Sequence, residues 1–137
     1  MEKINFVKLK KCNYFNGLSA KEVRVKLSGK DPHISFNQKI TKEIKERKFT
    51  HVNFGVGEHS NQLYLVFNYN EGYPIPNPDK YKVYIIRGRN VIDFLKEHFN
   101  LTGDSCVLAI SENLAKTQDY STYKISLPTE TQIIIDD

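Results

Sequence analysis

The 137-residue sequence contains no tryptophan, one methionine and two cysteines. Its apolar residues occur in short runs, and none approaches the roughly 20 residues that a membrane-spanning helix needs. The lysine-rich start, MEKINFVKLKK, has no continuous apolar segment of the kind found in signal peptides. We therefore expect no membrane association, no export signal and a cytoplasmic location.

Residues that commonly support catalysis or metal binding are also sparse. Cys12 and Cys106 lie far apart, and in a cytoplasmic protein we expect reduced thiols rather than a disulfide. The four histidines do not have metal-ligand spacing, and no acid, base and nucleophile form a recognisable set. Gly55-Val-Gly57 falls in a predicted hairpin rather than in a phosphate-binding loop. The sequence predicts a protein that is not an enzyme and has no metal or cofactor.

The composition is that of a globular protein, with 39% apolar and 26% charged residues. A chain of this length fits one domain, so we expect residues 1–137 to share one core. The net charge of +4 is unevenly distributed along the chain. Residues 1–50 hold 13 lysines and arginines against 5 acids, a net +8, whereas residues 51–137 hold 7 against 11, a net −4. Such segregation favours a basic surface for a polyanion, although solvated lysine-rich helices are an equal alternative.

Hydrophobic periodicity predicts an α+β fold with two helices and a predominantly antiparallel sheet. Residues 3–10 and 22–27 alternate apolar and polar side chains, as half-buried strands do, and Asn16-Gly17 between them is a turn signal. A short strand over 33–36 leads to Asn37, which is expected to cap a helix over 38–48. A hairpin then follows, made from HVNFGVG and QLYLVFN.

A similar order of elements recurs after a proline-rich stretch. The sequence predicts a strand over 81–86, a helix over 91–100 capped by Asn90, and a hairpin made from 105–111 and 120–127. The C-terminal QIIIDD is expected to add an edge strand. We interpret 23–68 and 81–127 as an approximate internal repeat, joined by a stiff connector over 69–80, with a surface loop of one domain as the alternative.

Two features are candidates for ligand contact. Arg87-Gly88-Arg89-Asn90 precedes the second helix, where arginines and free N–H groups could bind a phosphate; an ordinary turn with solvated arginines is the alternative. Eight tyrosines, some in the connector, could stack on bases or anchor a protein interface. The predicted nucleic-acid-binding residues are Arg24, Lys26, Lys39, Lys42, Arg87 and Arg89.

The repeated strand–helix–hairpin with basic strands resembles the double-wing DNA-binding domain of the middle-promoter activators of T-even phages. The resemblance is one of topology, covers at most residues 23–127 and assigns no site residues. It implies a nucleic-acid-binding or transcription-regulatory module with a basic surface. The alternative is a non-catalytic protein–protein interaction module, such as an accessory protein of a phage or mobile element, that docks a partner through an edge strand or the tyrosine-rich connector.

Overall fold

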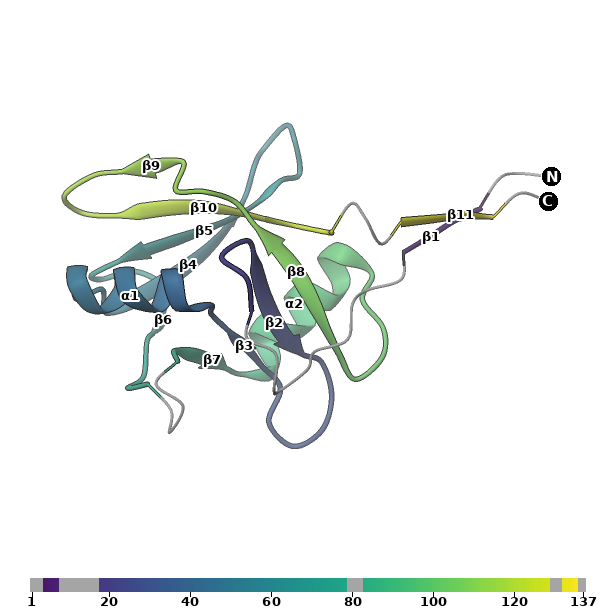
Figure 1. Ribbon diagram of the computed structural model, residues 1–137, viewed down its shortest axis with the longest axis horizontal. Helices are drawn as coiled ribbons and strands as arrows, with labels where there is room; N and C mark the ends of the chain where they lie inside the picture. The colour runs from purple at the N-terminus through teal and green to yellow at the C-terminus, as the bar shows by residue number, and fades with distance from the viewer. Residues whose placement is uncertain (1–3, 8–17, 79–82, 129–131, 136–137) are drawn as a thin grey trace.

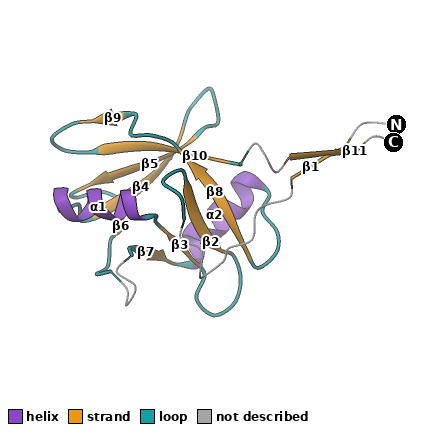
Figure 2. Cartoon of the chain, viewed as in Figure 1, coloured by secondary structure: helices purple, strands orange, loops and turns teal. Residues whose placement is uncertain are grey.

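The computed structural model describes residues 4–7, 18–78, 83–128 and 132–135 (Figure 1). In these residues two helices accompany strands that all pair antiparallel, which confirms the predicted α+β class (Figure 2). The helices have 10 and 11 residues, and no described helix is long and apolar enough to cross a membrane. Cys12, the Asn16-Gly17 turn and Tyr81 lie outside the described residues.

The elements follow the predicted order closely. The first half contains β1 (Ile4–Val7), β2 (Glu22–Lys26), β3 (His33–Ser35), α1 (Gln38–Arg47), β4 (His51–Val56) and β5 (Leu63–Asn68). The second half contains β6 (Tyr73–Pro74), β7 (Ile85–Arg87), α2 (Arg89–Phe99), β8 (Ser105–Ile110), β9 (Ala115–Lys116), β10 (Ser121–Ser126) and β11 (Gln132–Ile135).

The large sheet has the strand order β6-β4-β5-β10-β8-β2-β3-β7, and β9 pairs with β10 beside this path. The two predicted hairpin segments therefore meet at the β5–β10 pair, where Tyr123 lies opposite Leu65. The predicted C-terminal strand forms as β11, but it pairs with β1 in a separate two-stranded ladder with Ile4 opposite Ile135. This ladder extends from the main body toward the two termini in Figure 1.

One apolar core joins both predicted halves. Val25 of β2 and Leu65 of β5 are fully buried, as the alternation of their strands predicts. The same cluster includes Ile40 and Ile44 of α1 together with Val91, Ile92 and Leu95 of α2. The rings of Phe36 and Phe67 meet edge to face at 5.3 Å, and those of Phe67 and Tyr123 at 5.9 Å. Both helices thus bury their apolar stripes against one sheet.

Asn37 caps α1 as predicted. Its Oδ1 accepts a hydrogen bond from Ile40 N at 2.8 Å, which satisfies a free donor of the first turn. Its Nδ2 donates to the carbonyls of Ala20 at 3.2 Å and Glu22 at 2.9 Å. One buried side chain therefore starts the helix and also fixes that start to the beginning of β2.

The segment before α2 differs from the prediction in two ways. The predicted Asn90 cap is wrong, because the helix begins at Arg89 with Gly88 as the capping residue and no side-chain cap. Gly88 has φ +142°, a conformation that favours glycine and turns the chain directly from strand to helix. Of the described residues of the predicted 81–86 strand, only Ile85 and Ile86 belong to β7, which continues to Arg87. Tyr84 lies before it, and its carbonyl accepts from Phe36 N at 3.1 Å.

The described part of the proline-rich connector is attached to the sheet. Tyr73 and Pro74 form β6, opposite Val52 and His51 of β4. Ile75 N donates to Thr50 O at 2.8 Å, which extends the attachment by one residue. Proline is tolerated on an edge strand because it can leave its missing N–H on the solvent side.

Candidate nucleic-acid interface

The turn over residues 28–32, which joins β2 to β3, brings together basic side chains from distant parts of the sequence. Lys26, His33 and Arg87 lie opposite one another across β2, β3 and β7. Directly paired residues of antiparallel strands project to the same face, so these three side chains share one face of the sheet. Arg24 lies two positions before Lys26 on β2 and projects to that face, where it is half-buried.

Two arginines contact this turn. Arg87 Nε donates to Asp31 Oδ2 at 3.1 Å, and both side chains are about half exposed. Arg89 Nη2 donates to Gly29 O at 3.3 Å. His33 Nδ1 lies 2.7 Å from Asp31 O, and because a carbonyl only accepts, Nδ1 is the donor. The 87–90 segment is therefore held against the 28–32 turn by polar contacts.

The resulting cluster, here called the basic turn cluster, contains Lys26, Lys30, His33, Arg87 and Arg89. Its four lysines and arginines outnumber Asp31 and the nearby Asp104, which accepts from Ser28 Oγ at 2.9 Å. A positive excess therefore remains after local pairing. The sequence predicted Lys26, Arg87 and Arg89 but missed Lys30 and His33, since only the β2–β3–β7 register brings them together.

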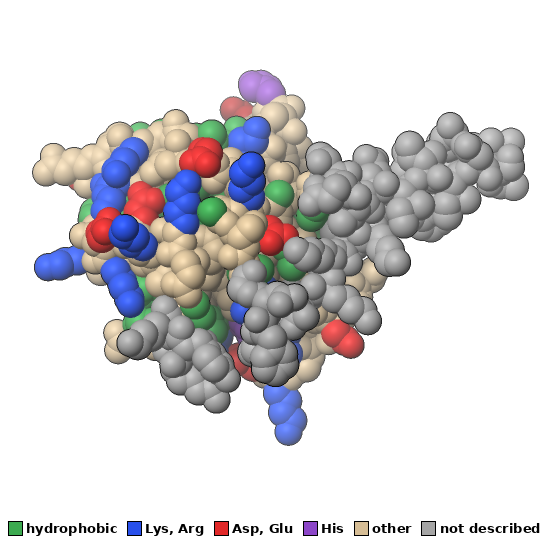
Figure 3. Space-filling view, in the orientation of Figure 1, with side chains coloured by type: hydrophobic (Ala, Val, Ile, Leu, Met, Phe, Trp, Pro, Cys, Tyr) green, Lys and Arg blue, Asp and Glu red, His purple; other side chains and the backbone are tan. Residues whose placement is uncertain are grey.

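The other two predicted residues, Lys39 and Lys42, lie elsewhere. They are on α1, whose start is fixed to the beginning of β2, at the opposite end of the β2–β3 pair from the 28–32 turn. Lys39 pairs with Glu112 at 2.8 Å, and Lys42 lies 3.9 Å from Glu46. Figure 3 shows lysine and arginine side chains gathered on the face that carries α1, with acidic side chains between them.

The Lys39–Glu112 pair makes a testable electrostatic prediction. The hydrogen bond from Lys39, then its charge and that of Lys21, hold the pKa of Glu112 below its usual range. Because the folded-state pKa is depressed, the stabilising contribution is present above the unfolded-state pKa and is lost as pH falls through the folded-state value. Carbon-detected NMR should place the Glu112 titration below that of ordinary glutamates, and Lys39→Gln should raise it. Lys45→Gln is the control, and an unchanged titration in Lys39→Gln would contradict the pairing.

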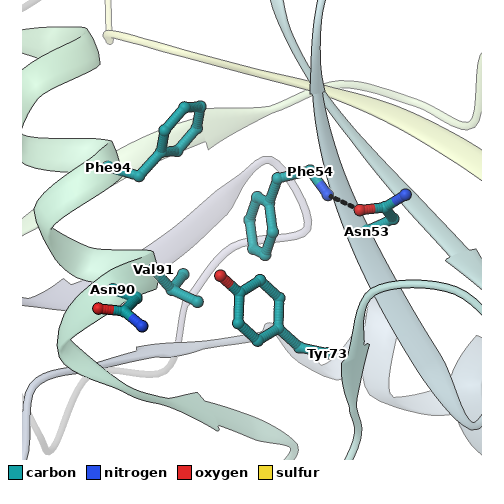
Figure 4. Close-up of a pocket in the computed structure, with 6 residues that line it drawn as sticks. All are labelled: Asn53, Phe54, Tyr73, Asn90, Val91 and Phe94. Atoms are coloured by element: carbon teal, nitrogen blue, oxygen red, sulfur yellow. Dashed lines mark hydrogen bonds between the residues drawn. The ribbon is translucent and has the colours of Figure 1, made fainter.

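A surface pocket of about 340 Å³ lies where α2 faces β4 and β6 (Figure 4). It is lined by Asn53, Phe54, Tyr73, Asn90, Val91 and Phe94. The rings of Phe54 and Tyr73 meet edge to face at 6.0 Å. Tyr73 and Phe94 are each 38% exposed, so both present part of their ring surface to solvent at the pocket. Asn90 directly follows Arg89, so this aromatic pocket adjoins the basic turn cluster through the first turn of α2.

Polar groups of the pocket have spare hydrogen-bonding capacity. The Tyr73 hydroxyl points across the gap toward Val91 and Asn90 (Figure 4). Neither that hydroxyl nor the Asn90 amide bonds to any residue that the structure describes. Asn53 Oδ1 accepts from Phe54 N at 3.1 Å, which leaves its amide N–H groups available. The sequence missed this pocket, because its lining residues come from three separate elements.

A half-buried polar network holds α1 against β10. Glu43 Oε1 accepts from Ser121 Oγ at 2.6 Å and from Asn113 Nδ2 at 3.1 Å, and Oε2 accepts from the Tyr123 hydroxyl. Arg47 Nη1 donates to Ser121 Oγ at 2.6 Å and lies 3.8 Å from Glu43 Oε1. Glu43 and Arg47 lie four residues apart on α1, and their side chains are only 17% and 16% exposed, so this ion pair is structural rather than a surface pair.

No group of three potential metal ligands occurs in the described part of the chain. No protein-family model, curated protein or solved structure matches this chain.

Proposed function

We propose that this protein is a nucleic-acid-binding or transcription-regulatory module whose main contact surface is the basic turn cluster. The observation that supports this most is the convergence of Lys26, Lys30, Arg87 and Arg89 from segments about sixty residues apart in sequence. Arginine forks and lysine ammonium groups that exceed the local acids suit phosphate oxygens. Lys39 and Lys42 of α1 remain a second predicted contact, each with an acid beside it.

The resemblance to double-wing DNA-binding domains is part of the same proposal. In both predicted halves a strand precedes a helix and two further strands, as β3-α1-β4-β5 and as β7-α2-β8-β10. The two segments also pair with each other, β3 with β7 and β5 with β10, which supports a common origin for them. A protein-interaction module remains the competing function, and it predicts no affinity for nucleic acid.

The salt dependence of binding tests this proposal. A fluorescein-labelled oligonucleotide should bind, and its affinity should fall linearly on a log–log plot between 50 and 200 mM salt. Arg87→Gln with Arg89→Gln removes two phosphate contacts, so the slope should decrease by about 1.5 in magnitude. Fluorescence anisotropy at several salt concentrations measures both quantities.

A matched double variant controls for net charge. Lys116→Gln with Lys124→Gln removes two positive charges from exposed positions outside the basic turn cluster and outside α1. Its slope should equal that of the unmodified protein. Equal slopes for both double variants would remove the basic turn cluster from the interface, and absence of binding at every salt concentration would favour the protein-interaction alternative.

A further inference from the structure

The aromatic pocket has the chemistry of a site for a flat, uncharged ring. The six described residues that line it include no charged side chain. Phe54, Tyr73 and Phe94 offer ring surfaces, and the Asn53 and Asn90 amides with the Tyr73 hydroxyl can donate and accept hydrogen bonds. An apolar pocket with a few convergent polar groups is typical of ligand sites, and about 340 Å³ is within their usual range.

Neighbouring rings on α2 hold the Phe94 ring in a position where a planar ligand can stack on it. The Phe94 ring lies nearly parallel to that of His98, with centroids 6.0 Å apart and an interplanar angle of 23°. His98 in turn meets Phe99 edge to face at 4.6 Å. This row of rings along α2 supports Phe94 on one side, while its exposed surface borders the pocket (Figure 4). The ring therefore needs little ordering when it binds a planar ligand.

The basic residues near the pocket indicate that its ligand carries an anionic group in addition to a flat ring. Arg89 and Asn90 are consecutive, so a cationic contact and a polar pocket residue belong to the same helical turn. Arg89 also contacts the 28–32 turn, where it donates to Gly29 O. Arg87 projects to the opposite face of β7 from the buried Ile86. A nucleotide combines the two required parts, an uncharged planar base and an anionic phosphate. Proteins that bind single strands combine the same two elements, aromatic stacking and a basic track.

We propose that the pocket formed by β4, β6 and α2 receives one unpaired base of single-stranded nucleic acid, and that the adjoining backbone passes Arg89 toward the basic turn cluster. This rests on the proposed function and narrows its ligand. A base within a duplex is stacked on both neighbours and cannot enter such a pocket without being extruded. The protein therefore prefers a single strand to a duplex of the same sequence.

Anisotropy with a labelled twelve-residue oligothymidylate, at one fixed salt concentration, tests the base site. Phe94→Ala and Tyr73→Ala should each weaken binding about tenfold, the usual effect of losing one base–aromatic stack. Tyr73→Phe keeps the ring and should retain most of the affinity. Tyr120→Ala is the matched control, because Tyr120 is 39% exposed and lies next to β10, away from the pocket. Thermal unfolding confirms that each variant is folded.

A second probe separates base from backbone recognition. An abasic deoxyribose-phosphate oligomer of the same length should bind more weakly than the oligothymidylate, and equally to the unmodified protein and to Phe94→Ala. The Phe94→Ala salt slope should stay unchanged, since no charge is removed. If Phe94→Ala binds oligothymidylate as tightly as Tyr120→Ala does, the base site is wrong while the proposed function stands. If the unmodified protein binds a duplex but neither oligomer, the base site is wrong and the proposed function stands. If it binds no duplex and neither oligomer, both proposals fail.

Discussion

Replacement of Glu43 by alanine should lower the free energy of unfolding by about 3 kcal/mol, because buried partners lose their acceptor. The hydroxyl of Tyr123 and that of Ser121 both donate to this carboxylate, and the two residues are 2% and 0% exposed. Arg47 would also keep its charge in a half-buried site without the acid beside it. Urea unfolding followed by circular dichroism measures the change.

Glu46 provides the control for that result. It is on the same helix, its side chain is 65% exposed, and its only described ion pair is with Lys42 at 3.9 Å. Exposed pairs of this kind contribute little, so Glu46→Ala should change the free energy of unfolding by less than about 0.5 kcal/mol. Equal effects of the two substitutions would show that the Glu43 network does not stabilise the packing of α1 against β10.

Gly72→Ala should be comparably destabilising, by about 3 kcal/mol, because backbone strain and a steric clash act together. Gly72 has φ +92°, and an added Cβ would lie 2.3 Å from Val52 O and 2.8 Å from Asn53 Cα. The following residue, Tyr73, pairs with Val52 and forms a wall of the aromatic pocket. The substitution should therefore also weaken oligonucleotide binding through displacement of β6.

Gly103→Ala separates strain from steric clash. Gly103 has nearly the same φ, +93°, but an added Cβ there would meet nothing within 4 Å. Its cost should be the backbone strain alone, about 1 kcal/mol, with no effect on oligonucleotide affinity. If Gly72→Ala lowers the free energy of unfolding by no more than Gly103→Ala does, the 72–73 segment does not pack as closely against β4 as the structure shows.

Sequence patterns predicted best the elements whose signals are local. The alternation in Glu22–Lys26 and the apolar positions of both helices reflect side-chain periods of two and 3.6, which depend only on neighbouring residues. Asn37 was recognised for the same reason, since its cap acts on a residue three positions ahead. Asn90 was misassigned because Gly88 can start the helix through its backbone conformation alone.

The features that sequence could not give depend on pairing between distant segments. β6 was read as part of a connector, because three prolines suggest an extended chain and nothing local indicates that β4 accepts it. The hydrogen bonds of Glu43 could not be predicted, since its partners lie 70 or more residues away. The exposure of Phe94 also depends on tertiary packing, since α2 buries Val91, Ile92 and Leu95 and exposes Phe94 beside them.

The candidate site also combines residues that the sequence predicted with an arrangement that depends on distant segments. Charge counting directed attention to Lys26, and the glycine-containing turn before the second helix to Arg87 and Arg89. Neither signal showed that all three meet at one turn. Their convergence requires β2, β3 and β7 to be neighbours, which is a property of the sheet order. The pocket combines residues of β4, β6 and α2, so it has no sequence motif.

Mapping of amide shifts during an oligonucleotide titration tests the central claim most directly. Nitrogen-15 spectra of the full chain, recorded with increasing oligothymidylate, should show the largest changes at residues 26–33 and 87–91, with smaller ones at Phe54 and Tyr73. Shifts confined to the exposed face of α1, or no shifts at oligonucleotide concentrations well above that of the protein, would contradict recognition through the basic turn cluster.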